Sequence, residues 1–156
     1  MNLLAHLHLA DETAESRLGN LLGDFVRGRP DDRFSPEIWR GIMHHRHLDV
    51  FTDSHPAWKQ SRNRLSKERT RFAGIVVDVI FDHFLSINWA DYSDQSLPDF
   101  LRDIYDAFDR SPEWLGEDLA PLVPRIKQEN WLMSYATHDG LALEVAPERL
   151  GLTVVH

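Results

Sequence analysis

The chain has 156 residues, 42% of them hydrophobic and 27% charged, which predicts one compact domain over residues 1–156 with a core of its own. A formal charge of −8 argues against general nucleic-acid binding, because affinity for phosphate backbones comes largely from Lys and Arg. The sequence contains no Cys, which excludes disulfides, thiolate metal sites and a Cys nucleophile.

The first predicted element lies at residues 2–10, where the apolar run favours a helix but its alternation also fits a strand. His6 and His8 would diverge in a helix, so that only one of them would serve a shared site. The run lacks the basic region and the cleavage-type ending of a signal peptide. No apolar stretch approaches the roughly 20 residues that span a bilayer. We therefore expect a cytoplasmic protein that does not bind membranes.

The second predicted helix covers residues 15–27 and is followed by Gly and Pro as stop signals. Asp24 ends a series of polar residues that recur every four positions from Ser16, and it can project from this apolar helix into an interior site. A plain amphipathic helix explains the same pattern equally well. Gly19 and Gly23 each cost roughly 1 kcal/mol of helix stability relative to Ala, which indicates close packing or a site that needs room.

The third predicted helix carries GIMHHRHLDVFTDSH, residues 41–55, with four His and two Asp in fifteen positions. It would begin at Pro36, with Ser35 as its N-cap, and continue to about residue 53. His45 and Asp49 are one turn apart, so they can supply two ligands of a divalent-cation site. The same spacing is also typical of an ion pair on a surface helix, and the sequence leaves both interpretations open.

A basic segment follows from Pro56 to about residue 71. Its six cations, the basic strip, are Lys59, Arg62, Arg64, Lys67, Arg69 and Arg71. A positive strip on an otherwise acidic protein can attract an acidic macromolecule. A solvated helix that is balanced by neighbouring carboxylates is the alternative.

Residues 72–88, FAGIVVDVIFDHFLSIN, form the most apolar stretch, and the i, i+4 spacing of two Asp within it favours a buried helix over a strand. Asp78, Asp82 and His83 would be costly to bury alone. A metal ion, an Arg partner or a His–Asp hydrogen bond could each compensate them. Further helices are expected at residues 97–108 and 119–135, whereas the tail from residue 139 has no clear period.

The chain lacks the GxSxG, GxxxxGK[ST] and HExxH motifs. What remains is a set of His and Asp residues spread over several helices, which suits manganese, iron or magnesium better than a structural zinc. A site of this kind can deprotonate a bound water and neutralise a phosphoryl oxygen, as phosphoester hydrolysis requires.

Four blocks, MNLLAHLHLA, GNLLGDFVRG, GIMHHRHLDVFTD and VDVIFDHFL, closely resemble the acyl carrier protein phosphodiesterases in sequence and in order over about residues 1–90. The resemblance implies an all-α fold related to the HD-domain metal-dependent phosphohydrolases. It also implies a divalent metal, with Mn²⁺ preferred and Mg²⁺ or Fe²⁺ possible. The implied reaction removes 4'-phosphopantetheine from a serine of holo acyl carrier protein, an acidic partner that gives the basic strip a purpose.

Carried onto this sequence, the resemblance implies five metal ligands: Asp24, His45, Asp49, Asp82 and His83. Asp78, Arg46 and His6 also fall on motif positions, and we expect catalytic roles for them. Asp78 could accept a proton, and Arg46 could bind the non-bridging phosphate oxygens. The family usually continues beyond the point at which this chain ends. A carrier-protein-binding module whose shortened end has lost catalysis is therefore one alternative function, and a metal phosphohydrolase of the same ancestry that acts on a nucleotide or another small phosphoester is the other.

Overall fold

The computed structural model describes residues 3–29, 32–65, 72–109, 120–137 and 139, which form helices and no strand. This confirms the predicted all-α class. The α-helices are α1 (Leu3–Leu9), α2 (Ala14–Leu22), α3 (Pro36–Ser54), α4 (Pro56–Arg64), α5 (Ala73–Ile87), α6 (Leu97–Asp109), α8 (Leu122–Gln128) and α9 (Trp131–Ser134), and a 3₁₀ turn, η2, covers Trp89–Asp91.

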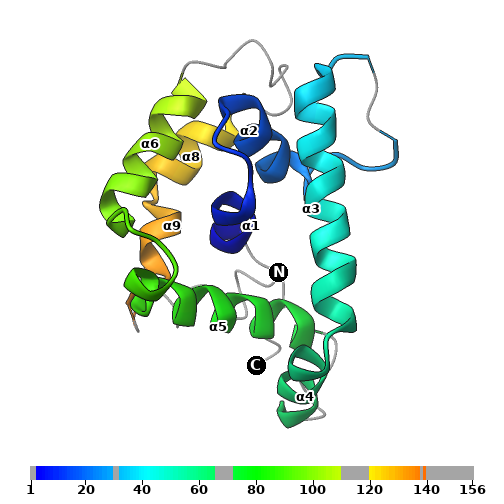
Figure 1. The fold of residues 1–156 in the computed structure, drawn as a ribbon, viewed down its shortest axis with the longest axis vertical. Coiled ribbons are helices and arrows are strands. Elements are labelled where there is room, and N and C mark those ends of the chain that lie inside the picture. Colours follow the sequence, from blue (N-terminus) through cyan, green and yellow to red (C-terminus); the bar gives the residue numbers. More distant parts are fainter. Residues whose placement is uncertain (1–2, 30–31, 66–71, 110–119, 138, 140–156) are drawn as a thin grey trace, which may run out of the picture.

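The short helix α1 lies at the centre of the fold, and the other helices surround it (Figure 1). The long helix α3 runs along one side, α5 crosses below α1, and α6 lies opposite α3 (Figure 1). Leu3, Leu4 and Leu7 of α1 are buried in the hydrophobic core that α2, α3 and α6 share with it. The basic helix α4 follows α3 and extends beyond the ring of helices (Figure 1).

Side-chain caps set the beginnings of three helices. Thr13 accepts a hydrogen bond from the Ser16 amide at the start of α2, and Ser35 accepts one from the Ile38 amide at the start of α3. The His55 ring accepts one from the Ala57 amide at the start of α4. Prolines occupy the first turns of α3 and α4, where no intrahelical amide bond is lost. The predicted start of the helix at Pro36, with Ser35 as its N-cap, is confirmed, and the basic segment that begins at Pro56 opens with a helix.

Two predicted boundaries are wrong. The second helix ends at Leu22 rather than near residue 27, because the chain turns there and the amides of Phe25 and Val26 both donate to the Leu22 carbonyl at 2.9 Å. The single helix predicted at residues 119–135 is two helices, α8 and α9. Asn130 separates them with a left-handed backbone, at φ 45°.

Glycines allow α2 and α3 to cross at very short range. A Cβ atom on Gly19 would lie 2.4 Å from the Ile38 carbonyl oxygen, and one on Gly41 would lie 2.7 Å from the Ser16 carbonyl oxygen. Neither position has space for a methyl group, so Gly19 does mark close packing. None of the helices in the described ranges has the length and apolarity that crossing a membrane requires.

We predict that Gly41→Ala lowers the free energy of unfolding by about 1–3 kcal/mol, because overpacking at the crossing outweighs the gain in helix propensity. The measurement is urea unfolding at 25 °C. Gly74→Ala in α5 is the matched control, since its added Cβ would meet the nearest Trp58 atom at an ordinary 3.5 Å. Equal stabilities of the two variants would contradict this account of the crossing.

Candidate metal centre

His6, His45 and Asp49 bring three potential ligand atoms within 4.8 Å of one another. His6 comes from α1 and the other two from α3. One Asp49 oxygen lies 3.0 Å from Nε2 of His6, and the other lies 3.2 Å from Nε2 of His45. The two imidazoles stack with their centroids 3.6 Å apart. Asp49 therefore faces two buried rings at once.

Asp24 brings a second carboxylate to the same point from the turn after α2. Its Oδ1 lies 3.2 Å from Nε2 of His45, and its side chain is 56% exposed, whereas the His45 side chain is 1% exposed. The cluster of His6, His45, Asp49 and Asp24, which we call the metal centre, is thus closed on its α1 side and open to solvent at Asp24.

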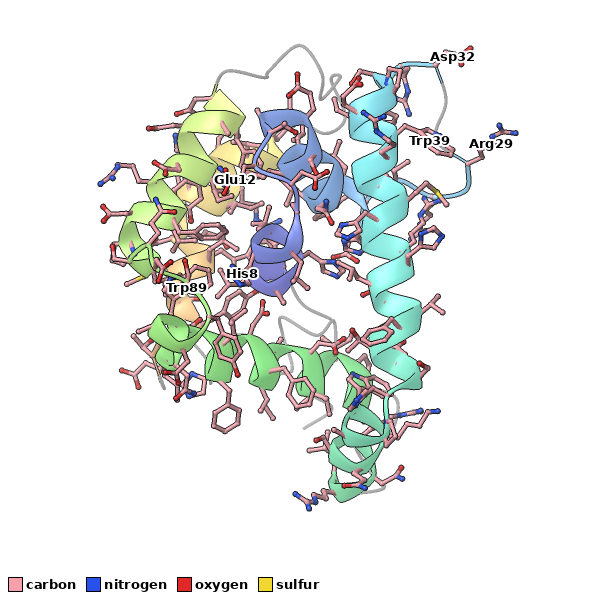
Figure 2. All side chains as sticks on the ribbon, in the orientation of Figure 1. His8, Glu12, Arg29, Asp32, Trp39 and Trp89 are labelled. Atoms are coloured by element: carbon pink, nitrogen blue, oxygen red, sulfur yellow. The ribbon has the colours of Figure 1, made fainter. Side chains whose placement is uncertain are left out.

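The two histidines of α1 diverge, as a helix requires. His6 faces α3 and the metal centre, while His8 lies with its ring centroid 4.8 Å from that of Trp89 in η2. Figure 2 shows His8 and Trp89 on the side of α1 that faces away from α3. Only His6 of the pair lies at the cluster, and the helical alternative for residues 2–10 is the correct one.

Asn20 fixes the orientation of the His45 ring. Nδ1 of His45 lies 2.8 Å from the Asn20 carbonyl oxygen. A carbonyl only accepts, so Nδ1 carries a proton, and Nε2 is the nitrogen that faces the carboxylates. This second hydrogen bond is typical of a metal-bound imidazole. A Cβ on Gly23 would lie 2.2 Å from the His45 ring, so this glycine provides the room that the ring occupies.

The carboxylates of Asp24 and Asp49 favour a positive charge at Nε2 of His45. Burial lowers the pKa of His45, but hydrogen bonds with Asp24 and Asp49 outweigh it and raise the pKa to about 9. Burial would raise the pKa of Asp49, yet hydrogen bonds with His45 and His6 hold it well below its usual range. Burial lowers the pKa of His6, against the effect of Asp49. A proton or a cation at this point neutralises the two carboxylates.

The residues present fit a divalent cation. They offer two imidazole nitrogens and two carboxylates, the mixed set that manganese, iron and related divalent ions accept. The bond from Nδ1 of His45 to a carbonyl leaves Nε2 as the nitrogen that would bind a metal once its proton is displaced. The geometry is therefore compatible with a divalent metal.

Two other predicted ligands, Asp82 and His83, are, like Asp24, not members of the group formed by His6, His45 and Asp49, but Asp24 contacts Nε2 of His45 whereas the contacts of Asp82 and His83 described here lie with other segments. Asp82 is fully buried and accepts hydrogen bonds from the amides of Leu4 and Ala5. Burial raises its pKa to about 7, against the lowering effect of those two amides. His83 is also buried, and its Nδ1 donates to the Tyr135 carbonyl at 2.6 Å.

Two residues expected to be catalytic, Asp78 and Arg46, make hydrogen bonds with other protein groups, and their catalytic roles stay predictions. Asp78 accepts a hydrogen bond of 2.8 Å from the indole of Trp58, and burial raises the pKa of Asp78. The Arg46 guanidinium donates to the carbonyls of Val26 and Gly28, both at 2.6 Å. Arg46 therefore holds the segment that follows Asp24.

The described half of the basic strip lies on α4, where Lys59, Arg62 and Arg64 are exposed. The Arg62 guanidinium lies 5.7 Å from the centroid of the buried Trp58 ring. Lys67, Arg69 and Arg71 lie outside the described residues.

Sequence reasoning placed Asn20 on the face of Asp24 but missed its role. The backbone carbonyl of Asn20 orients His45. Its side-chain Oδ1 lies 3.2 Å from Nδ1 of His44, and its side-chain Nδ2 donates to the Ser16 backbone carbonyl. The four-residue period was consistent with an inward-facing Asn20, but nothing in a sequence indicates that a backbone carbonyl binds a histidine. The contact between Trp58 and Asp78 gave no signal either.

Comparison with known proteins identifies one family. A family model described as acyl carrier protein phosphodiesterase matches residues 1–148. A protein of that name from Photorhabdus laumondii is 42% identical over 137 residues, which cover 87% of this chain and 69% of the relative. One from Yersinia enterocolitica is 55% identical over 102 residues, which cover 65% of this chain and 53% of the relative.

A third protein of the same name, from Escherichia coli, is 40% identical over 146 residues, covering 89% of this chain and 72% of the relative. No solved structure matches the chain, so the expected relationship to HD-domain phosphohydrolases stays a prediction.

We predict that MnCl₂ at 100 times its Kd raises the free energy of unfolding by about 2.7 kcal/mol, or Tm by about 5–10 °C, because the ion binds only the folded chain. His45→Ala should abolish this shift. His47→Ala, an exposed histidine of the same helix, should retain it. Thermal unfolding followed by circular dichroism provides the measurement, and a shift that survives in the His45 variant would place the ion elsewhere.

Proposed function

The chain belongs to the acyl carrier protein phosphodiesterase family, and from this membership and the metal centre we propose that it hydrolyses holo acyl carrier protein. The bond broken joins the phosphate of 4'-phosphopantetheine to a serine of the carrier protein. Water adds at phosphorus, and apo carrier protein and free phosphopantetheine are the products. The convergence of two histidines and two aspartates within a chain of this family is the observation that carries the proposal.

His6, His45, Asp49 and Asp24 would hold the ion, for which the family resemblance favours Mn²⁺ over Mg²⁺ and Fe²⁺. When bound, such an ion lowers the pKa of a coordinated water and neutralises charge on a phosphoryl oxygen. This assignment adds His6 to the ligands expected from the sequence. It replaces Asp82 and His83, whose hydrogen bonds lie with α1 and Tyr135.

The protein's own groups orient the site. The Asn20 carbonyl keeps the proton of His45 on Nδ1, so Nε2 remains available. Asp49 contacts both imidazoles with separate oxygens and so fixes their relative position. Asp24, the most exposed member, is the side from which we expect substrate to approach. We assign Arg46 to holding the Val26–Gly28 segment, and hence Asp24, rather than to binding phosphate.

The basic strip is the proposed docking surface for the acidic carrier protein. Its described part, on α4, begins at Pro56, directly after the helix that carries His45 and Asp49 ends at Ser54. A carrier protein bound there would lie next to the helix that supplies two of the proposed ligands. Opposite charges would also accelerate the encounter. Lys67, Arg69 and Arg71 remain predicted members of this surface.

Two predictions separate this function from its alternatives. A hydrolase of small phosphoesters would not depend on the basic strip, and a binding module without catalysis would need no metal.

The cytoplasmic location expected from the sequence also stays a prediction.

The first prediction concerns the reaction. Holo acyl carrier protein incubated with the protein and MnCl₂ should lose the mass of phosphopantetheine, as measured by intact-protein mass spectrometry. His45→Ala and Asp49→Ala should each reduce the rate by at least about 100-fold, because each removes a proposed ligand. His47→Ala serves as the control and should retain the rate. Unchanged turnover in the His45 variant would contradict the proposed centre.

The second prediction concerns docking. Reversing Lys59 and Arg64 to Glu should raise KM for holo acyl carrier protein about 10-fold or more, while turnover of bis(4-nitrophenyl) phosphate should stay unchanged. Arg62 is left intact because it packs on Trp58. Reversing Arg40 and Arg102, exposed cations on α3 and α6, imposes the same charge change elsewhere and is the control. Equal KM values in the two double variants would argue against docking at α4.

A further inference from the structure

Asp82 is a buried carboxylate of α5 that caps a different helix. Its Oδ2 accepts a hydrogen bond of 2.7 Å from the Leu4 amide, and its Oδ1 accepts one of 3.0 Å from the Ala5 amide. Both amides belong to the first turn of α1, where backbone N–H groups have no partner within the helix. A carboxylate there satisfies two donors and also interacts favourably with the positive end of the helix.

Helix α1 depends on such contacts for its position. It has seven residues, whereas isolated helices shorter than roughly 12 residues are marginal in water. Its leucines pack into the core, but apolar packing is non-directional and permits small rotations about the helix axis. The two directional bonds to Asp82 restrict that rotation.

His6 directly follows the second capped amide. Its Nε2 meets Asp49 at 3.0 Å and its ring stacks on His45, but its buried Nδ1 has no hydrogen-bond partner among the described residues. Among the described residues, no hydrogen bond to Nδ1 orients the His6 ring in the way that the Asn20 carbonyl orients the His45 ring. The position of His6 therefore depends on the backbone of α1.

From these contacts we propose that Asp82 is a positioning residue, which holds α1 so that Nε2 of His6 lies at the metal centre. The inference rests on the proposed function only in taking the centre to bind metal. Displacement of a reacting group by about 1 Å can cost two orders of magnitude in rate, so a rotation of α1 would matter.

A role for Asp82 as a ligand is less consistent with its surroundings. Unlike Asp24, which contacts Nε2 of His45, Asp82 has both oxygens turned to the amides of α1, so it would have to move to offer a ligand atom to His6, His45 and Asp49. That movement would leave the buried Leu4 amide and the Ala5 amide without their acceptor. An unsatisfied buried donor costs about 1–3 kcal/mol.

The test uses Mn²⁺ bound to the full chain and needs no substrate. Electron spin echo spectroscopy counts the histidine nitrogens coupled to the ion, and titration gives its Kd. We expect Asp82→Asn to weaken Mn²⁺ binding about 10–100-fold and to remove one of two histidine couplings. Adding this change to His6→Ala should cause no further loss, because both act through the same ligand.

Ser86→Ala is the matched control. The Ser86 hydroxyl is buried and donates to the Asp82 carbonyl, so its removal disturbs the same turn of α5 without touching α1. Both histidine couplings should persist in this variant. Loss of a coupling here as well would show that general loosening of α5 displaces His6, and would overturn the specific role of Asp82.

A second variant approaches the contact from α1 and covers the case in which Asp82→Asn does not fold. Ala5→Pro removes the amide that donates to Oδ1 while Asp82 stays, and Ala5 lies in the first turn of α1, where that amide has no partner within the helix. We expect it to lose the His6 coupling too. Retention of both histidine couplings in Ala5→Pro or Asp82→Asn would overturn the proposal. If Asp82→Asn kept both couplings but bound Mn²⁺ more weakly, Asp82 would be a ligand instead.

These outcomes are independent of the proposed reaction. A wild-type protein that binds Mn²⁺ through two histidines but releases no phosphopantetheine would refute the proposed function and leave the role of Asp82 intact. If the wild-type protein hydrolyses holo acyl carrier protein and the Asp82→Asn variant keeps both histidine couplings, the proposed function stands and the proposed role of Asp82 is refuted.

Discussion

The structure is organised around an excess of negative charge beside one buried imidazole nitrogen. The carboxylates of Asp24 and Asp49 both approach Nε2 of His45 at 3.2 Å, while Nδ1 is committed to a carbonyl. Two carboxylates this close to a buried ring need a compensating positive charge. A proton meets that need in the free protein, and a divalent cation meets it with more favourable coordination. The surrounding helices serve to keep these groups together.

Close packing of α2 on α3 makes this arrangement possible. Gly19 and Gly41 let the two backbones approach until the Asn20 carbonyl reaches Nδ1 of His45, and Gly23 leaves space for the ring itself. A larger residue at the crossing would separate the carbonyl from the ring and free the tautomer. The conformational cost of glycine in a helix is thus offset by the orientation of a ligand. Fold and site share this constraint, so they cannot vary independently.

The sequence revealed those parts of the centre that depend on helical spacing. His45 and Asp49 lie one turn apart, and the glycines of α2 marked a place that needs room, so both were predictable. The partners of the buried polar residues were not. Asp82 could have been compensated by metal, Arg or His, and only the fold shows that the amides of Leu4 and Ala5, 78 and 77 positions away, do so. Helical period shows which way a side chain points, not which backbone group meets it.

The polar residues of α5 show what that distinction means for function. Asp78 accepts from Trp58 of α4, Asp82 accepts from the start of α1, and His83 donates to the carbonyl of Tyr135, which follows α9. Each therefore joins α5 to a different segment, and each is buried or half-buried where an unpaired polar group would be costly. Residues that resemble a catalytic set in their chemistry can thus serve instead to fix the helices that carry other functional groups. In this chain α5 holds the basic helix through one carboxylate and the helix of His6 through the next. The proposed docking surface and the candidate metal centre are therefore both tied to a single apolar helix.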